Sequence, residues 1–122
     1  MSIQSYRDLK VWQRAMELAE LSYQITKEYP SEERYGLISQ IRRSSTSVVA
    51  NIAEGQGRSH VKEFLNHLSM AKGSLVELET LLLLSQRVGF LKEPQLAKAM
   101  EISAEVGRMI TGLRHSLESR LI

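Results

Sequence analysis

Two prolines and two glycine-bearing links divide the chain into long segments with helical periodicity. The dividing points are Pro30, Gly55-Gln56-Gly57, and the pair formed by Gly89-Phe90 and Pro94, and no segment shows the apolar–polar alternation of a strand. The pattern predicts four helices and three short connections. Because short connections place consecutive helices antiparallel, we expect an all-α, up-down four-helix bundle formed by a single domain over residues 1–122.

Local signals predict where the helices begin and end. The first helix is expected from Tyr6 or Asp8 to Glu28, and the third from Ser59 or His60 to Val88. Ser31 is expected to cap the start of the second helix, and Gly55 its end. Gly89 is expected to end the third helix, and Pro94 to lie in the first turn of the fourth, which continues almost to Ile122.

The composition is that of a globular protein with an ordinary core. The chain has 122 residues, of which 43% are hydrophobic and 25% charged, and this length suffices for one core. The absence of cysteine excludes disulfides and cysteine-ligated zinc. The first residues lack an apolar signal core, and no apolar run reaches the roughly 18 residues that span a bilayer. We therefore expect a cytoplasmic protein without a membrane partner.

Two regions carry more apolar surface than a monomer needs. The first helix has one apolar stripe, interpreted as core, made of Leu9, Trp12, Met16, Ala19 and Tyr23. A second seam, almost opposite, is made of Val11, Leu18 and Ile25 and is interpreted as a contact with another subunit. Leu81 to Leu84 surround the third helix on all sides, which again calls for a neighbouring chain, with Leu81 and Leu84 at the interface. The sequence therefore predicts a homo-oligomer.

A stripe of polar residues borders the predicted core of the second helix. Its members are Gln40, Arg43, Ser47, Asn51 and Glu54. They form either a structural hydrogen-bonded network, in which Arg43, Asn51 and Glu54 satisfy one another, or a solvated edge.

Basic residues are unevenly distributed, although the formal net charge is only +2. Residues 42–72 contain Arg42, Arg43, Arg58, Lys62 and Lys72 against Glu54 and Glu63. Three further cations, Arg7, Lys10 and Arg14, share one face near the start of the first helix. Such an excess is either a nucleic-acid footprint or a solvated face.

No residue pattern indicates catalysis or a cofactor. His60, Glu63 and His67 share a helix face but lack the spacing of a metal-binding HExxH motif, so a polar outer face is the favoured interpretation. The serines of the second helix have no activating histidine, and Glu54 has no nucleophile beside it. The segment 55–59 could bind a phosphate, but it is more simply a turn between two helices. We expect no enzyme activity, no metal and no cofactor.

Several short motifs together resemble a known family. They are Leu9-Lys10-Val11-Trp12-Gln13-Arg14-Ala15, Gly36-Leu37-Ile38-Ser39-Gln40-Ile41-Arg42-Arg43, Asn51-Ile52-Ala53-Glu54-Gly55, and Gly73-Ser74 followed by Glu77-Leu78-Glu79. The chain resembles, over residues 6 to about 117, the bacterial four-helix-bundle proteins encoded in intervening sequences of 23S ribosomal RNA genes. The resemblance implies an antiparallel bundle that assembles into a five-fold ring.

The same family is similar to the accessory variability protein of diversity-generating retroelements, a basic barrel that binds nucleic acid and a reverse transcriptase. The resemblance therefore implies a pentameric, non-catalytic module that binds RNA or DNA, with a protein such as a reverse transcriptase as a further partner. The predicted contacts are Arg42, Arg43, Arg58, Lys62, Arg7, Lys10 and Arg14. The alternative is a homo-oligomeric protein-interaction scaffold without direct nucleic-acid contact.

Overall fold

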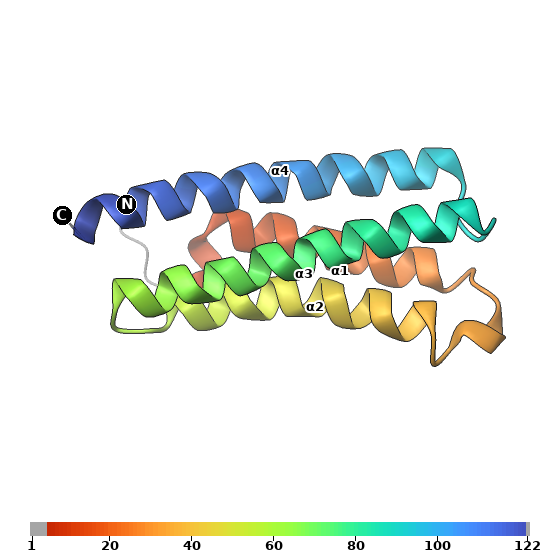
Figure 1. The fold of residues 1–122 in the computed structure, drawn as a ribbon, viewed down its shortest axis with the longest axis horizontal. Coiled ribbons are helices and arrows are strands. Elements are labelled where there is room, and N and C mark those ends of the chain that lie inside the picture. Colours follow the sequence, from red (N-terminus) through yellow and green to blue (C-terminus); the bar gives the residue numbers. More distant parts are fainter. Residues whose placement is uncertain (1–4, 122) are drawn as a thin grey trace.

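The computed structural model of the chain describes residues 5–121 and contains four α-helices and no strand in that range (Figure 1). The helices are α1 (Lys10–Thr26), α2 (Leu37–Gln56), α3 (Val61–Arg87) and α4 (Glu93–Glu118). Short 3-10 helices, Tyr6–Asp8, Ser31–Glu33 and Ser119–Leu121, precede α1, precede α2 and follow α4. The all-α antiparallel four-helix arrangement predicted from the sequence is confirmed.

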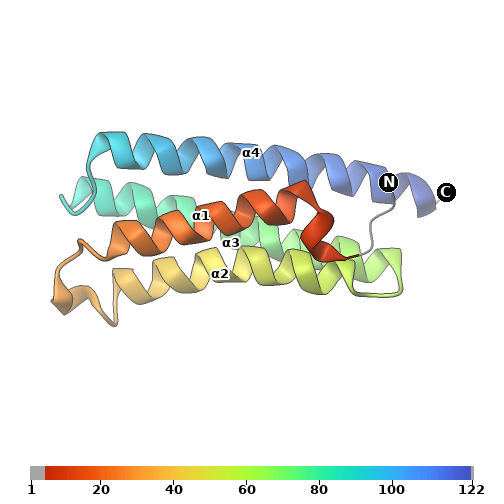
Figure 2. The same cartoon turned by 180° about the vertical axis from the view of Figure 1, so that it is seen from behind.

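The helices form an elongated bundle in which each packs beside two others. α1 contacts α2 and α4, and α3 contacts α2 and α4, with α2 and α3 sharing the most extensive contact. Figure 2 shows the start of α1 near the α2–α3 connection and the end of α4. We call this end of the bundle the turn end. The opposite end holds the α1–α2 and α3–α4 connections.

All four helices contribute to one apolar core. Leu68, Leu75, Leu78 and Leu82 bring α3 into its centre with at most 1% of each residue exposed. Five serines are buried as well: Ser22, Ser44, Ser45, Ser85 and Ser103. Their small size lets adjacent helices approach closely, as packing without voids requires.

The face of α1 that enters the core is only partly the one predicted: Ala19 of the predicted stripe is buried, and Leu9 and Trp12 pack against the core. Val11, Leu18 and Ile25, interpreted from the sequence as a subunit interface, are 5%, 1% and 2% exposed and lie in the core of their own chain. Ala15 and Ser22 complete this inward face, so α1 packs through small residues that carry little apolar signal. The bulkier stripe that includes Met16 and Tyr23 borders α2 instead, and Tyr23 is 40% exposed.

The leucine run of α3 divides between the core and the surface. Leu82 is fully buried and Leu81 is half-buried against the core, so Leu81 is largely unavailable to another subunit. Leu84 is exposed, as a subunit contact requires. Other exposed apolar residues lie near it on the same helix. We call the set Val76, Leu83, Leu84 and Val88 the outer α3 face.

Two predicted helix ends differ from the structure, and two agree. α2 begins at Leu37, whose backbone N–H donates to the Glu33 carboxylate at 3.1 Å, rather than after Ser31. It continues through the buried Gly55 to Gln56, so Gly55 does not end the helix. Gly89 follows α3 with a φ of 89°, a conformation that favours glycine. Proline lies in the first turn of α4, as predicted.

No helix in the described part of the chain is long and apolar enough to cross a membrane.

Candidate nucleic-acid interface

The structure separates the predicted basic residues into two groups. Arg7 lies in the 3-10 helix before α1, and Lys10 is the first residue of α1. Arg58 lies in the α2–α3 connection, and Lys62 lies in the first turn of α3. These four residues are therefore near the turn end (Figure 2). All four are exposed. Arg42 and Arg43 lie in the first two turns of α2, towards the opposite end. The set therefore cannot act as one compact site.

Arg42 is engaged within the bundle. Its Nε donates to Thr26 Oγ1 at 2.9 Å, and its guanidinium lies 4.6 Å from the centre of the Tyr23 ring. Both partners belong to α1. Arg42 therefore ties α2 to α1, whereas its neighbour Arg43 is exposed and its side chain makes no hydrogen bond or ion pair with the described residues.

Arg14 is also held by carboxylates. It forms ion pairs with Glu17 on its own helix and, at 2.8 Å, with Glu105 on α4. Hydrogen bonds to Glu17 and to Glu105 raise the pKa of Arg14 above its ordinary value. The groove beside this cluster also contains Glu20 and Lys98, so the two cations, Arg14 and Lys98, face three carboxylates. Arg14 therefore offers little positive potential to a polyanion.

A pocket of about 330 Å³ opens at the turn end. Its apolar lining comes from the start of α1, the start of α3 and the end of α4, and its polar lining from the α2–α3 connection and the chain's last turn. The lining residues are Leu9, Val61, Phe64, Leu113 and Leu117, with Gln56, Arg58, Ser59, His60 and Arg120. None of the described residues that line it carries a carboxylate. We call it the turn-end pocket.

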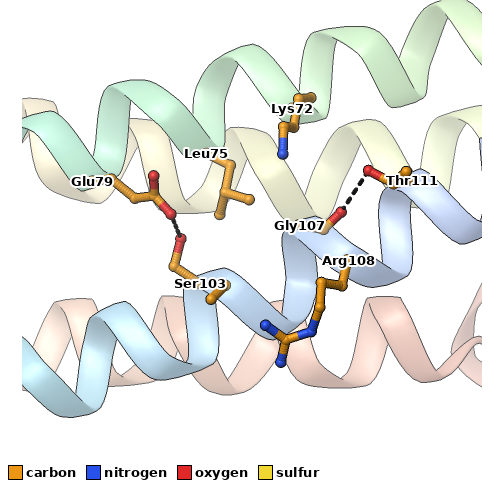
Figure 3. Close-up of a pocket in the computed structure, with 8 residues that line it drawn as sticks. Lys72, Leu75, Glu79, Ser103, Gly107, Arg108 and Thr111 are labelled. Atoms are coloured by element: carbon orange, nitrogen blue, oxygen red, sulfur yellow. Dashed lines mark hydrogen bonds between the residues drawn. The ribbon is translucent and has the colours of Figure 1, made fainter.

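A second basic recess lies between α3 and α4, further from the turn end (Figure 3). Lys72 extends from α3 towards Gly107 of α4, where a Cβ atom would lie 3.2 Å from the Lys72 Nζ. Glu79, the only carboxylate of the lining, accepts a hydrogen bond from the buried Ser103 hydroxyl. Arg108 and Thr111 complete the polar edge. We call this recess the α3–α4 groove.

Three arginines of the C-terminal region were missed as site candidates. Arg108, Arg114 and Arg120 recur every six residues, a spacing visible in the sequence but outside the basic segment that attracted attention. Arg114 Nη1 donates to the Leu65 carbonyl at 2.8 Å and to Ser69 Oγ at 2.6 Å, joining α4 to α3. Arg120 lies in the turn-end pocket and Arg108 in the α3–α4 groove. Only the tertiary structure brings them beside Arg58 and Lys72.

The predicted polar stripe of α2 faces α3 and forms a network with it. Asn51 Nδ2 donates to the Ser47 carbonyl at 2.9 Å, and Asn51 Oδ1 lies 3.1 Å from His67 Nδ1. Glu54 is 3.7 Å from the same His67 nitrogen. Ser47 bonds to Ser74 at 2.8 Å, which extends the network further along α3.

Two members of the predicted stripe stay outside this network. The backbone carbonyl of Gln40 accepts a hydrogen bond from the Ser44 hydroxyl at 2.8 Å, but the Gln40 side chain makes no hydrogen bond with the described residues. The Arg43 side chain makes no hydrogen bond or ion pair with Asn51 or Glu54. His67, predicted to lie on an outer face, instead takes the place expected for Arg43.

Gly55 explains why α2 and α3 can pack so closely at this level. A Cβ atom at Gly55 would lie 2.8 Å from both His67 Cβ and Phe64 Cδ1. Only glycine leaves room there, so the Asn51–Gly55 segment is a helix-packing motif. Through Phe64, the same contact positions one wall of the turn-end pocket.

Within residues 5–121, no group of three or more histidine, aspartate or glutamate side chains is placed to hold a metal ion. His60 lies at the N-cap of α3, and His67 bonds to α2.

These features define an antiparallel four-helix-bundle protein with exposed cations beside a pocket at one end and along the α3–α4 groove. Residues 7–112 match the family described as the 23S rRNA-intervening sequence protein. The chain belongs to this family. A comparison with curated proteins finds no match.

The fold is similar to a solved crystal structure, described as a protein with unknown function from the S23 ribosomal protein family of Bacteroides thetaiotaomicron VPI-5482. The two chains are 26% identical with a TM-score of 0.79, over 85% of this chain and 97% of the other.

Proposed function

We propose that this protein is a non-catalytic, homo-oligomeric module of the cytoplasm that binds nucleic acid through the turn end of its bundle. The observation that carries the proposal is the turn-end pocket, whose lining brings Arg58 and Arg120 together. The side chains of Arg58, Arg120 and the nearby Lys62 make no hydrogen bond or ion pair with the described residues, and none of the described residues that line the pocket carries a carboxylate. Such a surface attracts phosphates by releasing their counterions.

The α3–α4 groove continues this surface along the bundle. Lys72 and Arg108 form no ion pair within the described part of the chain, and Glu79 is occupied by Ser103. Arg114 lies between the groove and the turn end. A nucleic-acid backbone crossing from one to the other meets cations from α3 and α4 in turn.

Binding of a structured RNA at increasing salt, measured by fluorescence anisotropy, tests the proposal. The variant Arg58→Ala/Lys62→Ala/Arg120→Ala removes three turn-end cations. We expect weaker binding and a salt dependence whose log–log slope falls by roughly two to three, because each phosphate contact contributes roughly 0.7–0.9.

The matched control is Arg34→Ala/Arg87→Ala/Lys92→Ala, which removes three exposed cations from the opposite end. Both variants change the net charge equally, so an effect of total charge alone would lower the RNA affinity of both variants. The proposal predicts a loss for the turn-end variant only. Equal affinities of both variants and the unaltered protein would contradict it, as would no binding at low salt.

For the assembly, we propose a head-to-tail ring built from two different surfaces, with five subunits as the family resemblance implies. The outer α3 face supplies exposed apolar side chains. A groove of about 430 Å³ beside α1 and α2, lined by Met16, Ala19 and Tyr23 among others, supplies a complementary surface. Contacts between unlike surfaces close into rings when the rotation between subunits permits.

A protein-interaction scaffold is the second candidate, because the outer α3 face would also suit an apolar protein partner, such as a reverse transcriptase, by analogy with related proteins. Affinity capture from nuclease-treated lysate distinguishes the two. A partner retained by the unaltered protein, and lost on replacement of Leu83 and Leu84 by lysine, favours the scaffold when RNA binding is also absent.

A further inference from the structure

We propose that the turn-end pocket binds one unpaired nucleotide of a single-stranded nucleic acid, with the base in its apolar interior and the adjoining phosphate at Arg58 and Arg120. This inference rests on the proposed function and specifies its partner. It follows from the combination of apolar and basic side chains in the pocket lining, because a phosphate group gains nothing from contact with apolar side chains.

The lining provides two distinct binding surfaces. Val61, Phe64 and Leu117 present apolar side chains, and Phe64 is held in place by its close contact with Gly55. An aromatic side chain in an apolar recess stabilises a base that has left its stack. A base in a duplex has its faces covered by its neighbours and cannot enter such a recess.

The polar side of the pocket complements a phosphate. Arg58 comes from the α2–α3 connection and Arg120 from the 3-10 helix after α4, and neither makes an ion pair within the described residues. His60, exposed at the start of α3, adds an aromatic ring that can stack on a base or donate to an oxygen. Because the described lining contains two arginines and no aspartate or glutamate, it favours an anion over a cation or a zwitterion.

Size and position agree with a single nucleotide. A volume of about 330 Å³ is at the lower end of the roughly 300–1,000 Å³ range of small-molecule sites, too small for a folded segment. The α3–α4 groove, in contrast, has fewer large apolar side chains and contains the carboxylate of Glu79, so it suits backbone contacts. The pocket and the groove together predict that a single nucleic-acid strand places one base in the turn-end pocket and its sugar-phosphate backbone along α4.

The experiment compares three ten-nucleotide ligands on the full chain by fluorescence anisotropy at fixed salt: a single-stranded RNA, the same RNA in a duplex, and an abasic ribose-phosphate strand. Electrostatics alone favours the duplex, which has the highest charge density. We expect the single strand to bind about tenfold more tightly than the abasic strand, consistent with roughly 1–3 kcal/mol for one base stack, and more tightly than the duplex.

A variant that fills the pocket without changing its charge isolates the base contribution. Ser59→Trp places a large ring at the exposed edge of the pocket, and Ser31→Trp places the same ring at the opposite end as a control. We expect Ser59→Trp to abolish the preference for the single strand over the abasic strand, while Ser31→Trp keeps it. Equal thermal midpoints of both variants establish that each folds.

The possible outcomes separate this inference from the proposed function. If all three ligands bind equally, or the duplex binds best, and the turn-end triple variant weakens each of them, nucleic-acid binding stands and the nucleotide pocket is overturned. If no ligand binds, both proposals fail. If NMR signals of His60 and Phe64 respond to protein concentration and not to RNA, the pocket is covered by a second copy of the chain and the inference is also overturned.

Discussion

At the scale of single residues, two residues of the same type in similar helical positions have different roles because their surroundings differ. Gly55 and Gly73 both lie inside helices of the closely packed α2–α3 pair, and Gly73 belongs to a motif shared with the family. A Cβ atom at Gly55 would clash with α3, whereas nothing lies within 4 Å of one at Gly73. Close approach of α2 and α3 therefore requires glycine at position 55 and not at position 73.

These two glycines give a matched pair of stability predictions. Gly55→Ala forces α2 and α3 apart, and overpacking of this kind costs about 1–3 kcal/mol. Gly73→Ala adds only helix propensity, and we expect it to stabilise the protein by about 0.5–1 kcal/mol. Urea unfolding of both variants checks the signs. A stabilised Gly55→Ala variant would contradict the close contact.

Tyr29 gives a second prediction at this scale. The residue is 6% exposed, its ring packs on Phe90, and its hydroxyl makes no hydrogen bond in the described structure. Since an unpaired buried hydroxyl opposes folding, we expect Tyr29→Phe to leave the free energy of unfolding unchanged or to raise it by up to about 1 kcal/mol. Tyr29→Ala, the control, is expected to cost about 3–5 kcal/mol by opening a cavity.

The pH dependence of the same variant follows from the ionisation of Tyr29. Burial of the side chain raises the pKa of Tyr29 above its ordinary value. The unfolded chain therefore loses this proton at lower pH than the folded one, so the contribution of Tyr29 to stability is lost as pH rises above about 10. We expect the advantage of Tyr29→Phe over the unaltered protein, from urea unfolding, to grow between pH 9 and 11. A constant difference would contradict the shift.

At the scale of elements, polar contacts fix how neighbouring helices are joined. Arg42 joins α2 to α1, Arg14 joins α1 to α4, Arg114 joins α4 to α3, and Asn51 with His67 joins α2 to α3. Every neighbouring pair in the bundle therefore has at least one such contact. Three of the four use an arginine that a sequence reading would assign equally well to a nucleic-acid surface.

Arg42 and Arg43 test this distinction. Arg42→Ala removes a hydrogen bond and a cation–π contact, so we expect a loss of about 1–2 kcal/mol in stability. Arg43→Ala, with the same charge change at an exposed position, is expected to stay within about 0.5 kcal/mol of the unaltered protein. Thermal and urea unfolding provide the measurement. Equal stabilities of the two variants would show that Arg42 is not part of the α1–α2 contact.

At the scale of the whole molecule, the question is which apolar surface is free to meet another copy. Leu18 was predicted to lie in an interface, but it is buried in the core of its own chain. Leu83 and Leu84, in contrast, are 44% and 46% exposed on the outer α3 face. A surface of this kind on an otherwise polar bundle is typical of a protein contact.

Lysine substitutions distinguish the two positions. Leu18→Lys buries an unpaired charge, and we expect it to unfold the chain rather than to dissociate an assembly. Leu83→Lys/Leu84→Lys is expected to retain the helical circular dichroism and thermal midpoint but to lower the mass measured by light scattering. Ala50→Lys/Ala97→Lys, which adds the same charge at two exposed positions, is the control and should keep the original mass. An unchanged mass for the leucine variant would exclude this face.

The sequence by itself determined the number of helices, their order and their antiparallel packing, because proline, glycine and apolar periodicity act locally. It also predicted Arg58 as a phosphate contact, since that residue lies in a conspicuous connection, and this stays a prediction. The face of α1 that enters the core was decided only by the tertiary structure, because Ala15 and Ser22 allow close packing without a strong apolar pattern. The turn-end pocket was also decided only by the tertiary structure. Its Arg58 and Arg120 are 62 residues apart in the chain and meet only when the helix ends come together.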